Sequence, residues 1–172
     1  ALAALALFGW RQTRAPRPLM SIPLARARTF WVAFVAWAIT FGSLIGAMFI
    51  GQQFTQNVLG YDTLLAAAVV VPSAVCTAVF GQIAGRLVAA RGSRVSFVLG
   101  LSSVALAFAV MLFAWRDGAA IGWVLLAYAL VGTGVGLAAT PASRSLMSSV
   151  PPARGGMGSA FLDLTRDFGG AI

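Results

Sequence analysis

Three charged side chains lie close together in an otherwise apolar segment near the end of the chain, GMGSAFLDLTRDFGGAI (156–172). Asp163 and Arg166 are spaced i, i+3 on a helix, so they can form an ion pair. At about 100° per residue, one arc of roughly 100° collects the polar and small residues of this segment, which are Ser159, Asp163, Arg166, Asp167 and Gly170. The segment therefore predicts a helix with one charged face and one apolar face.

The depth of these charges decides between two interpretations. If the helix enters a membrane near Gly158, Asp163 lies about 8 Å and Arg166 about 12 Å inside, at about 1.5 Å per residue. A charge at that depth costs several kcal/mol unless it is paired or faces water, so such residues usually face a polar pathway. The alternative is that this turn lies among the lipid headgroups, where charge costs little.

A second polar group closes the first long apolar stretch of the chain. Neutral amides there can bond a substrate, water or a neighbouring helix, and the structural alternative is an interfacial helix end. Met48 and Phe49, one turn earlier, are candidates for an adaptable apolar cavity, although lipid-facing residues have the same appearance. The amide residues are Gln52, Gln53, Gln56 and Asn57.

A third candidate is GRLVAARGSR (85–94), which we expect to be a short turn between two spans. Glycine and arginine in such a turn can cap helix ends and bond backbone carbonyls. A simple topology signal also explains its arginines. The residues of interest are Gly85, Arg86, Leu87, Arg91, Gly92 and Arg94.

The elements that would position these residues are membrane helices. Four stretches (29–61, 63–85, 95–115 and 118–143) carry no charged residue, and each reaches the roughly 20 residues that cross about 30 Å of hydrocarbon. Backbone groups in lipid have no water to bond, so long apolar runs that do not alternate predict helices. We predict spans near 30–52, 63–85, 95–115 and 121–143, and a further one over 157–172.

The arginines between these spans indicate their orientation. Alternate gaps carry ten arginines on one side and a single one, Arg116, on the other. The positive-inside rule assigns the arginine-rich gaps to the cytoplasm. The sequence therefore predicts a multi-pass protein of the cytoplasmic (inner) membrane.

Composition supports a membrane protein and excludes several other classes. Of the 172 residues, 60% are hydrophobic and 9% are charged, against about 25% charged in soluble domains. The net charge of +8 comes from arginines in short gaps, which argues against a nucleic-acid partner. With no His and a lone apolar Cys76, we expect no metal site and no enzyme.

Glycine and proline inside the spans predict close helix packing. Small residues let helix backbones approach each other, and membrane bundles tolerate proline when a neighbour satisfies the freed carbonyl. Pro72 lies inside the second span. The predicted packing positions are Gly42, Gly46, Gly132, Gly134, Gly136, Pro141, Gly169 and Gly170.

Several of these motifs together resemble the major facilitator superfamily. GRLVAARGSR is similar to its cytoplasmic loop signature G-x-L-a-D-r-x-G-r-r, with Ala89 in place of the Asp. Residues 130–171, LVGTGVGLAATPASRSLMSSVPPARGGMGSAFLDLTRDFGGA, resemble the Gly-rich helix, the VP loop and the following helix of the fourteen-helix drug:proton antiporter branch (EmrB/QacA type). QNVLGYDTLLAA (56–67) is similar to another turn of that branch.

The resemblance implies an all-α, polytopic helix bundle that is part of a major-facilitator fold. Residues 1–9 would end a preceding membrane helix, 10–29 would be a basic cytoplasmic linker, and 30–172 would form helices of the second half. The chain would be an internal fragment of about half a transporter, whose partners are membrane lipid, a small-molecule substrate and the missing part of the same polypeptide.

The resemblance also implies a function, proton-driven export by alternating access between two helix bundles, powered by the proton gradient without a cofactor. Asp163 would bind or relay a proton, and Arg166 would stabilise its deprotonated form, with Asp167 beside them. Two alternatives stay open: a permease for a nutrient or metabolite, and a membrane scaffold subunit that transports nothing.

Overall fold

The computed structural model describes residues 28–116, 118–148, 159, 163–167 and 169–170 of the chain. All regular structure in this part is helical, which confirms the all-α prediction. The segment 1–9 and residues 10–27 of the predicted linker 10–29 lie outside the described residues, and the last two residues of that linker belong to a helix. The helices are α3 (Arg28–Gln53), α4 (Thr63–Ala68), α5 (Val71–Arg91), α6 (Ser93–Ala114) and α7 (Ile121–Ser148), with a π-helical turn over Phe54–Val58.

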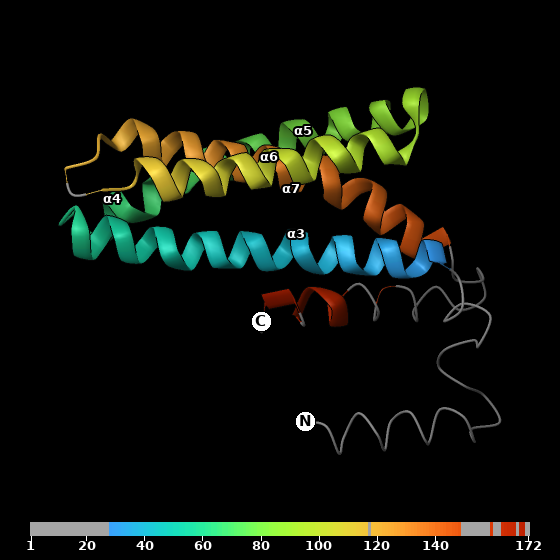
Figure 1. Ribbon diagram of the computed structural model, residues 1–172, viewed down its shortest axis with the longest axis horizontal. Coiled ribbons are helices and arrows are strands. Elements are labelled where there is room, and N and C mark those ends of the chain that lie inside the picture. The colour runs from blue at the N-terminus through green and yellow to red at the C-terminus, as the bar shows by residue number, and fades with distance from the viewer. Residues whose placement is uncertain (1–27, 117, 149–158, 160–162, 168, 171–172) are drawn as a thin grey trace, which may run out of the picture.

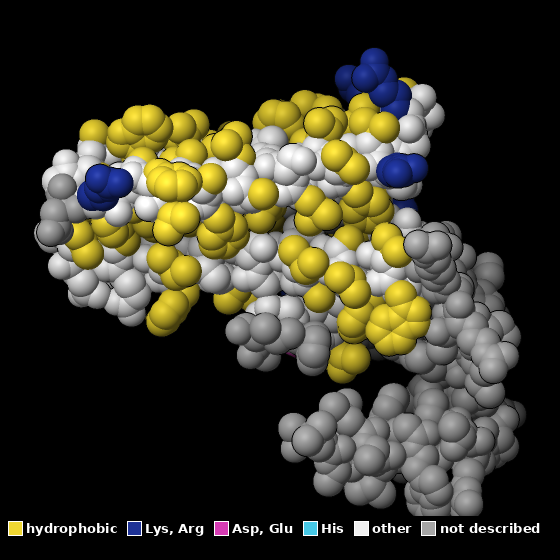
Figure 2. Space-filling view, viewed as in Figure 1, with side chains coloured by type: hydrophobic (Ala, Val, Ile, Leu, Met, Phe, Trp, Pro, Cys, Tyr) yellow, Lys and Arg dark blue, Asp and Glu magenta, His cyan; other side chains and the backbone are white. Residues whose placement is uncertain are grey.

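The helices lie along one axis, and the chain reverses direction between successive membrane-spanning segments, whereas α4 leads into α5 without a reversal (Figure 1). Four segments are long and apolar enough to cross a membrane: Phe34–Val58, Thr63–Arg91, Ser93–Ala114 and Ile121–Ser145. Large apolar side chains are exposed over much of the face shown in Figure 2. For example, Leu64 is 80% and Leu112 75% exposed, as expected for side chains solvated by lipid.

Helix α7 forms the centre of the described bundle, because it packs against α5, α6 and α3. Glycines on different faces of α7 allow these close contacts. A Cβ atom at Gly132 or Gly136 would meet the backbone of α5 at Ser73 or Thr77, whereas one at Gly134 would meet Gly100 of α6. The predicted glycines of α7 therefore serve two different interfaces.

Hydroxyl groups supplement this packing with hydrogen bonds between helices. The Ser103 Oγ donates to the Leu130 carbonyl oxygen at 2.8 Å. The single hydroxyl hydrogen of Thr77 is shared between the carbonyl oxygen of Ser73 in its own helix, at 2.7 Å, and that of Gly132, at 3.1 Å. Ser96 Oγ donates to the Leu137 carbonyl oxygen at 2.6 Å. A membrane supplies no water to bond these hydroxyl groups, so the carbonyl oxygens of the bundle serve as their acceptors instead.

The Ser96 bond accounts for a proline inside a buried helix. Pro141 lies within α7 and is fully buried. Its nitrogen carries no hydrogen, so it cannot donate to the carbonyl oxygen four residues earlier, which is that of Leu137. The Ser96 hydroxyl bonds this same oxygen. Beyond this point α7 inclines toward the start of α3 (Figure 1).

The predicted second span is divided into two helices. Helix α4 begins after Asp62, whose Oδ1 accepts a hydrogen bond from the Leu65 N–H at 3.0 Å and so caps the helix. Helix α4 ends at Ala68, and α5 begins at Val71 with Pro72 in its first turn, where a missing amide hydrogen is tolerated.

The expected turn over 85–94 is wrong. Helix α5 continues to Arg91, so most of this motif is helical, and a single residue, Gly92, separates it from α6. Gly92 has φ +83°, a backbone conformation that side chains with a Cβ rarely adopt. The sequence GRLVAA contains no helix breaker other than Gly85, so the helix ends only where Gly92 allows the reversal.

Candidate functional site

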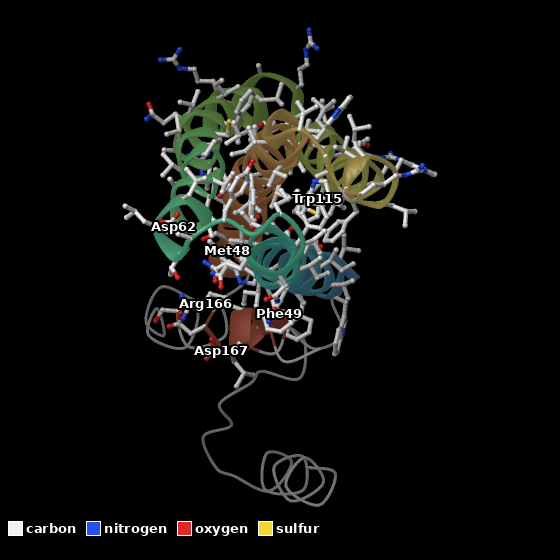
Figure 3. All side chains as sticks on the ribbon, turned by 90° about the vertical axis from the view of Figure 1, so that its left-hand side faces the viewer. Met48, Phe49, Asp62, Trp115, Arg166 and Asp167 are labelled. Carbon is white, nitrogen blue, oxygen red and sulfur yellow. The ribbon has the colours of Figure 1, made fainter. Side chains whose placement is uncertain are left out.

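Asp163, Arg166 and Asp167 form a charged group on the C-terminal helical segment, defined here as the described residues between 159 and 170. The Arg166 guanidinium lies 3.6 Å from the Asp163 carboxylate and 3.5 Å from that of Asp167. All three side chains are at least 49% exposed in this chain. Figure 3 shows Arg166 and Asp167 on the same side of the molecule as Asp62 and Met48.

Glycines position this segment against α3. A Cβ atom at Gly42 would collide with the backbone of Gly169, and one at Gly169 would collide with that of Ala38. A Cβ atom at Gly170 would meet the side chain of Ile45. The two helices thus touch backbone to backbone, which only glycine permits at Gly42 and Gly169. Gly46, predicted to pack beside Gly42, faces open space among the described residues.

The contact with α3 also gives the position of the charges along that helix. Gly169 lies level with residues 38–42, about 18 Å along α3 from Arg28 at about 1.5 Å per residue. The following residue, Gly170, meets the later Ile45, so the two helices run in the same direction. Asp163 and Arg166 precede Gly169 by six and three residues, which places them about 9 and 14 Å beyond the level of Arg28. Asp163 is therefore level with about Phe34, where the apolar segment Phe34–Val58 begins, and Arg166 lies about one turn further along it.

The predicted polar cluster lies at the end of α3 and in the π-helical turn that follows it. Gln52, Gln53 and Asn57 are exposed and Gln56 is half-buried. Asn57 and Gln56 belong to the π-helical turn, where the Asn57 Nδ2 donates to the Gln53 Oε1. The amides therefore bond each other, at least in part, at a helix end.

Met48 and Phe49 are exposed. A hollow of about 550 Å³ lies between α3 and α6 near Trp115. Its lining consists of Ile50, Phe54, Phe108, Met111, Leu112 and Trp115. The Phe54 and Trp115 rings stack there, with centroids 4.8 Å apart. Sequence reasoning missed this hollow, although large aromatic side chains at the ends of two predicted spans were a usable signal.

The loop-motif residues lie at the opposite end of the bundle from Trp115. Arg86, Arg91 and Arg94 are exposed, whereas Leu87 is half-buried. The Arg144 Nη2 of α7 lies 3.9 Å from where a Cβ of Gly85 would be. A Cβ at Gly85 would therefore make only an ordinary van der Waals contact with this guanidinium. The described residues hold no cluster of three or more His, Cys, Asp or Glu side chains that could bind a metal ion.

Comparison with known sequences identifies the family. The family model described as Major Facilitator Superfamily matches residues 2–172. The chain belongs to the major facilitator superfamily. It is thus a multi-pass membrane protein of a family of transporters rather than of enzymes, and the four membrane-spanning segments agree with that fold.

Among its relatives in this superfamily are several exporters. The chain is 30% identical to the multidrug resistance protein Stp of Mycobacterium tuberculosis over 172 residues, which is 100% of the chain and 32% of Stp. It is 28% identical to the multidrug efflux pump LfrA of Mycolicibacterium smegmatis over 167 residues, 97% of the chain and 33% of LfrA. The cephamycin export protein CmcT of Amycolatopsis lactamdurans is 32% identical over 156 residues, covering 87% of the chain and 32% of CmcT.

The chain therefore spans about one third of the length of the relatives that it matches. This share is smaller than the half that the motifs predicted. The names of these relatives confirm the resemblance to the drug-exporting branch of the superfamily.

Proposed function

We propose that the full protein containing this chain exports drugs or other small amphipathic compounds across the cytoplasmic membrane, by alternating access coupled to the proton gradient. The observation that carries the proposal is the charged group of Asp163, Arg166 and Asp167, held by glycine contacts beside the first turns of the apolar segment of α3. The names of the relatives Stp, LfrA and CmcT support export as the direction of transport.

The charged group supports proton coupling because its charge depends on one proton. With both carboxylates ionised, the two negative charges and the single positive charge of Arg166 sum to −1. Uptake of one proton by Asp163 brings the group to zero and leaves Arg166 beside Asp167, whose Oδ1 is 3.5 Å away. A group with net charge −1 can bind either a proton or a cationic substrate. Because the two compete for the same charge, binding of one favours release of the other, which couples their movements in opposite directions.

The charged group is largely uncovered within this third of the protein. Its carboxylates are 67% and 74% exposed, and an exposed charged face at membrane depth would be costly against hydrocarbon. We infer that it faces the remaining polypeptide or a water-filled pathway between the two bundles, where substrate would also pass.

The test compares two Asp→Asn variants of the full-length protein. Asp163→Asn removes the titratable carboxylate but keeps size and polarity. Asp62→Asn is the matched control, because Asn also caps helices well and Asp62 caps α4 outside the charged group. Uptake of ethidium, a lipophilic cation, is followed in inverted membrane vesicles with and without an imposed proton gradient.

We expect the Asp163→Asn variant to lose gradient-driven uptake and to fall to the level measured without a gradient. The Asp62→Asn variant should retain the wild-type response. Unchanged gradient-driven uptake in the Asp163→Asn variant would remove this carboxylate from the coupling mechanism. Uptake driven in the opposite direction, into right-side-out vesicles, would support a permease instead.

A further inference from the structure

Two serine hydroxyls hold α6 to α7. The Ser96 Oγ donates to the Leu137 carbonyl oxygen at 2.6 Å, and the Ser103 Oγ donates to that of Leu130 at 2.8 Å. Neither serine bonds a carbonyl oxygen of its own helix among the described residues. A displacement of α6 along α7 therefore breaks both bonds. The Leu137 oxygen then has no amide donor to replace Ser96, because Pro141 lacks the amide hydrogen.

Side chains of α6 also interlock with α7 along much of its length. The Val104 Cγ2 lies 2.5 Å from where a Cβ of Gly134 would be, so this side chain occupies the notch that the glycine leaves. Met111 belongs to the same apolar cluster as Val131 and Val135 of α7. Moving α6 along α7 would withdraw these side chains from closely packed positions. The buried residues of α6 recur every three or four positions and so form one face: Ser96, Gly100, Val104, Ala107 and Met111.

Helix α5 packs on α7 without such interlocking side chains. The buried residues of α5 are Ser73 and Ala84, so none of its large side chains is fully buried. Instead the helix backbones meet directly, since a Cβ atom at Gly132 would collide with the backbone of Ser73. Packed helices can shift past each other by small amounts, and a contact made by small residues offers little steric resistance to such a shift.

The hydroxyls between α5 and α7 belong to threonines that also have an acceptor in their own helix. The Thr77 Oγ1 lies 3.1 Å from the Gly132 carbonyl oxygen of α7 and 2.7 Å from the Ser73 carbonyl oxygen of α5. Thr140 likewise has one acceptor in each helix, at 3.3 Å on α5 and 3.4 Å on α7. Because a threonine hydroxyl can bond within its own helix, a shift of α5 against α7 leaves neither hydroxyl without an acceptor.

The helix is interrupted at both ends of α5. Before its first residue, Val69 and Val70 separate it from α4. After its last residue, Gly92 alone connects it to α6, with φ +83°, at the reversal of the chain (Figure 1). Glycine has no Cβ to restrict its backbone dihedrals, so one such residue can serve as a hinge. A one-residue link also prevents a long slide of α5 past α6, so rotation about Gly92 is the motion that these connections allow.

We propose that α5 pivots about Gly92 across the face of α7 that carries Gly132 and Gly136, while α6 and α7 move together as one body. The displacement grows with distance from the hinge. Val75 precedes Gly92 by 17 residues, or about 25 Å of helix, so a rotation of about 5° moves it by roughly 2 Å. This motion lies within the chain and does not depend on Asp163, on the substrate or on proton coupling.

The test measures distances between pairs of spin labels in the purified full-length protein by double electron–electron resonance. The cysteines of the protein, Cys76 among them, are first replaced by Ala. All pairs share one label on α7, at Leu126→Cys. The second label is on α5 far from the hinge (Val75→Cys), on α5 beside the hinge (Arg91→Cys), or on α6 (Leu106→Cys). All four labelled sites are exposed among the described residues.

We expect the Val75 pair to give a distance distribution at least about 2 Å broader than the Leu106 pair, as one wide peak or as two peaks. The Arg91 pair, whose label lies one residue from Gly92, should be as narrow as the Leu106 pair. Equal widths for the Val75 and Leu106 pairs would overturn the proposal. Equal broadening of the Val75 and Arg91 pairs would overturn it as well, because the whole helix would then slide rather than pivot.

Discussion

The Leu137 carbonyl offers a quantitative test of how this bundle tolerates a buried proline. Replacing Ser96 by Ala removes the hydroxyl that donates to this oxygen at 2.6 Å. Pro141 supplies no amide hydrogen, and Leu137 is 7% exposed, so the oxygen would lose its hydrogen bond away from water. The expected consequence is a destabilised contact between α6 and α7.

The magnitude follows from what the carbonyl loses. A buried polar group left without a partner costs about 1–3 kcal/mol, whereas hydrogen bonds between membrane helices average about 0.6 and reach about 1.7 kcal/mol. Because the helix itself provides no replacement donor, we expect the Ser96→Ala variant to lose about 1.5 kcal/mol of unfolding free energy. That loss lowers the folding equilibrium constant about tenfold.

Ser103→Ala is the matched control. Its hydroxyl also donates to a carbonyl oxygen of α7, that of Leu130, at 2.8 Å. The residue four positions later is Gly134, which keeps its amide hydrogen, so the Leu130 oxygen retains a helical donor. We expect this variant to lose about 0.6 kcal/mol or less.

A double-mutant cycle isolates the link between Ser96 and Pro141. Replacing Pro141 by Ala restores an amide hydrogen for the Leu137 oxygen, so Ser96→Ala should then cost about 1 kcal/mol less than in the wild-type background. Unfolding of the full-length protein by dodecyl sulfate in mixed micelles, followed by circular dichroism, measures all four variants. An equal cost of Ser96→Ala in both backgrounds would refute the reasoning.

Two other substitutions test the packing. Gly42→Ala would place a Cβ on the backbone of Gly169 and should cost about 1–3 kcal/mol of unfolding free energy. Gly46→Ala, in open space on the same helix, should be neutral or stabilise by up to about 1 kcal/mol. Equal effects of the two substitutions in the same unfolding assay would contradict the observed contact. Tyr128→Phe removes a buried hydroxyl that has no partner among the described residues, so its melting temperature should stay the same or rise, and a clear fall would show that this hydroxyl is bonded in the full protein.

The membrane spans could be predicted from sequence because their signal is local. A run such as 95–115 is apolar at nearly every position, and this is enough to require a helix in lipid whatever surrounds it. The observed helix, Ser93–Ala114, begins two residues earlier and ends one residue earlier than the predicted span. The turn over 85–94 was predicted wrongly because charge marks the membrane boundary, whereas the helix continues into water until Gly92 ends it.

Glycine roles could not be read from spacing. Gly42 and Gly46 are four residues apart and so lie on similar faces of α3, yet only Gly42 touches another backbone among the described residues. Gly132 and Gly134 are two residues apart and contact different helices. Which glycine is needed depends on where a neighbouring helix crosses, and that crossing is a property of the assembled bundle.

For the charged group too, the sequence determined some properties and the tertiary structure determined others. The order Asp163, Arg166, Asp167 determined by itself that the three side chains can pair on one helix face, because helical periodicity is fixed by the backbone. Only the tertiary structure decided where along α3 they lie, through the contact of Gly169 with that helix. Likewise the sequence determined that Pro141 would free a carbonyl, but only the packing of α6 on α7 brought Ser96, 41 residues from Leu137 along the chain, to that oxygen. Local chemistry follows from neighbours in sequence, whereas depth and partners follow from contacts between distant segments.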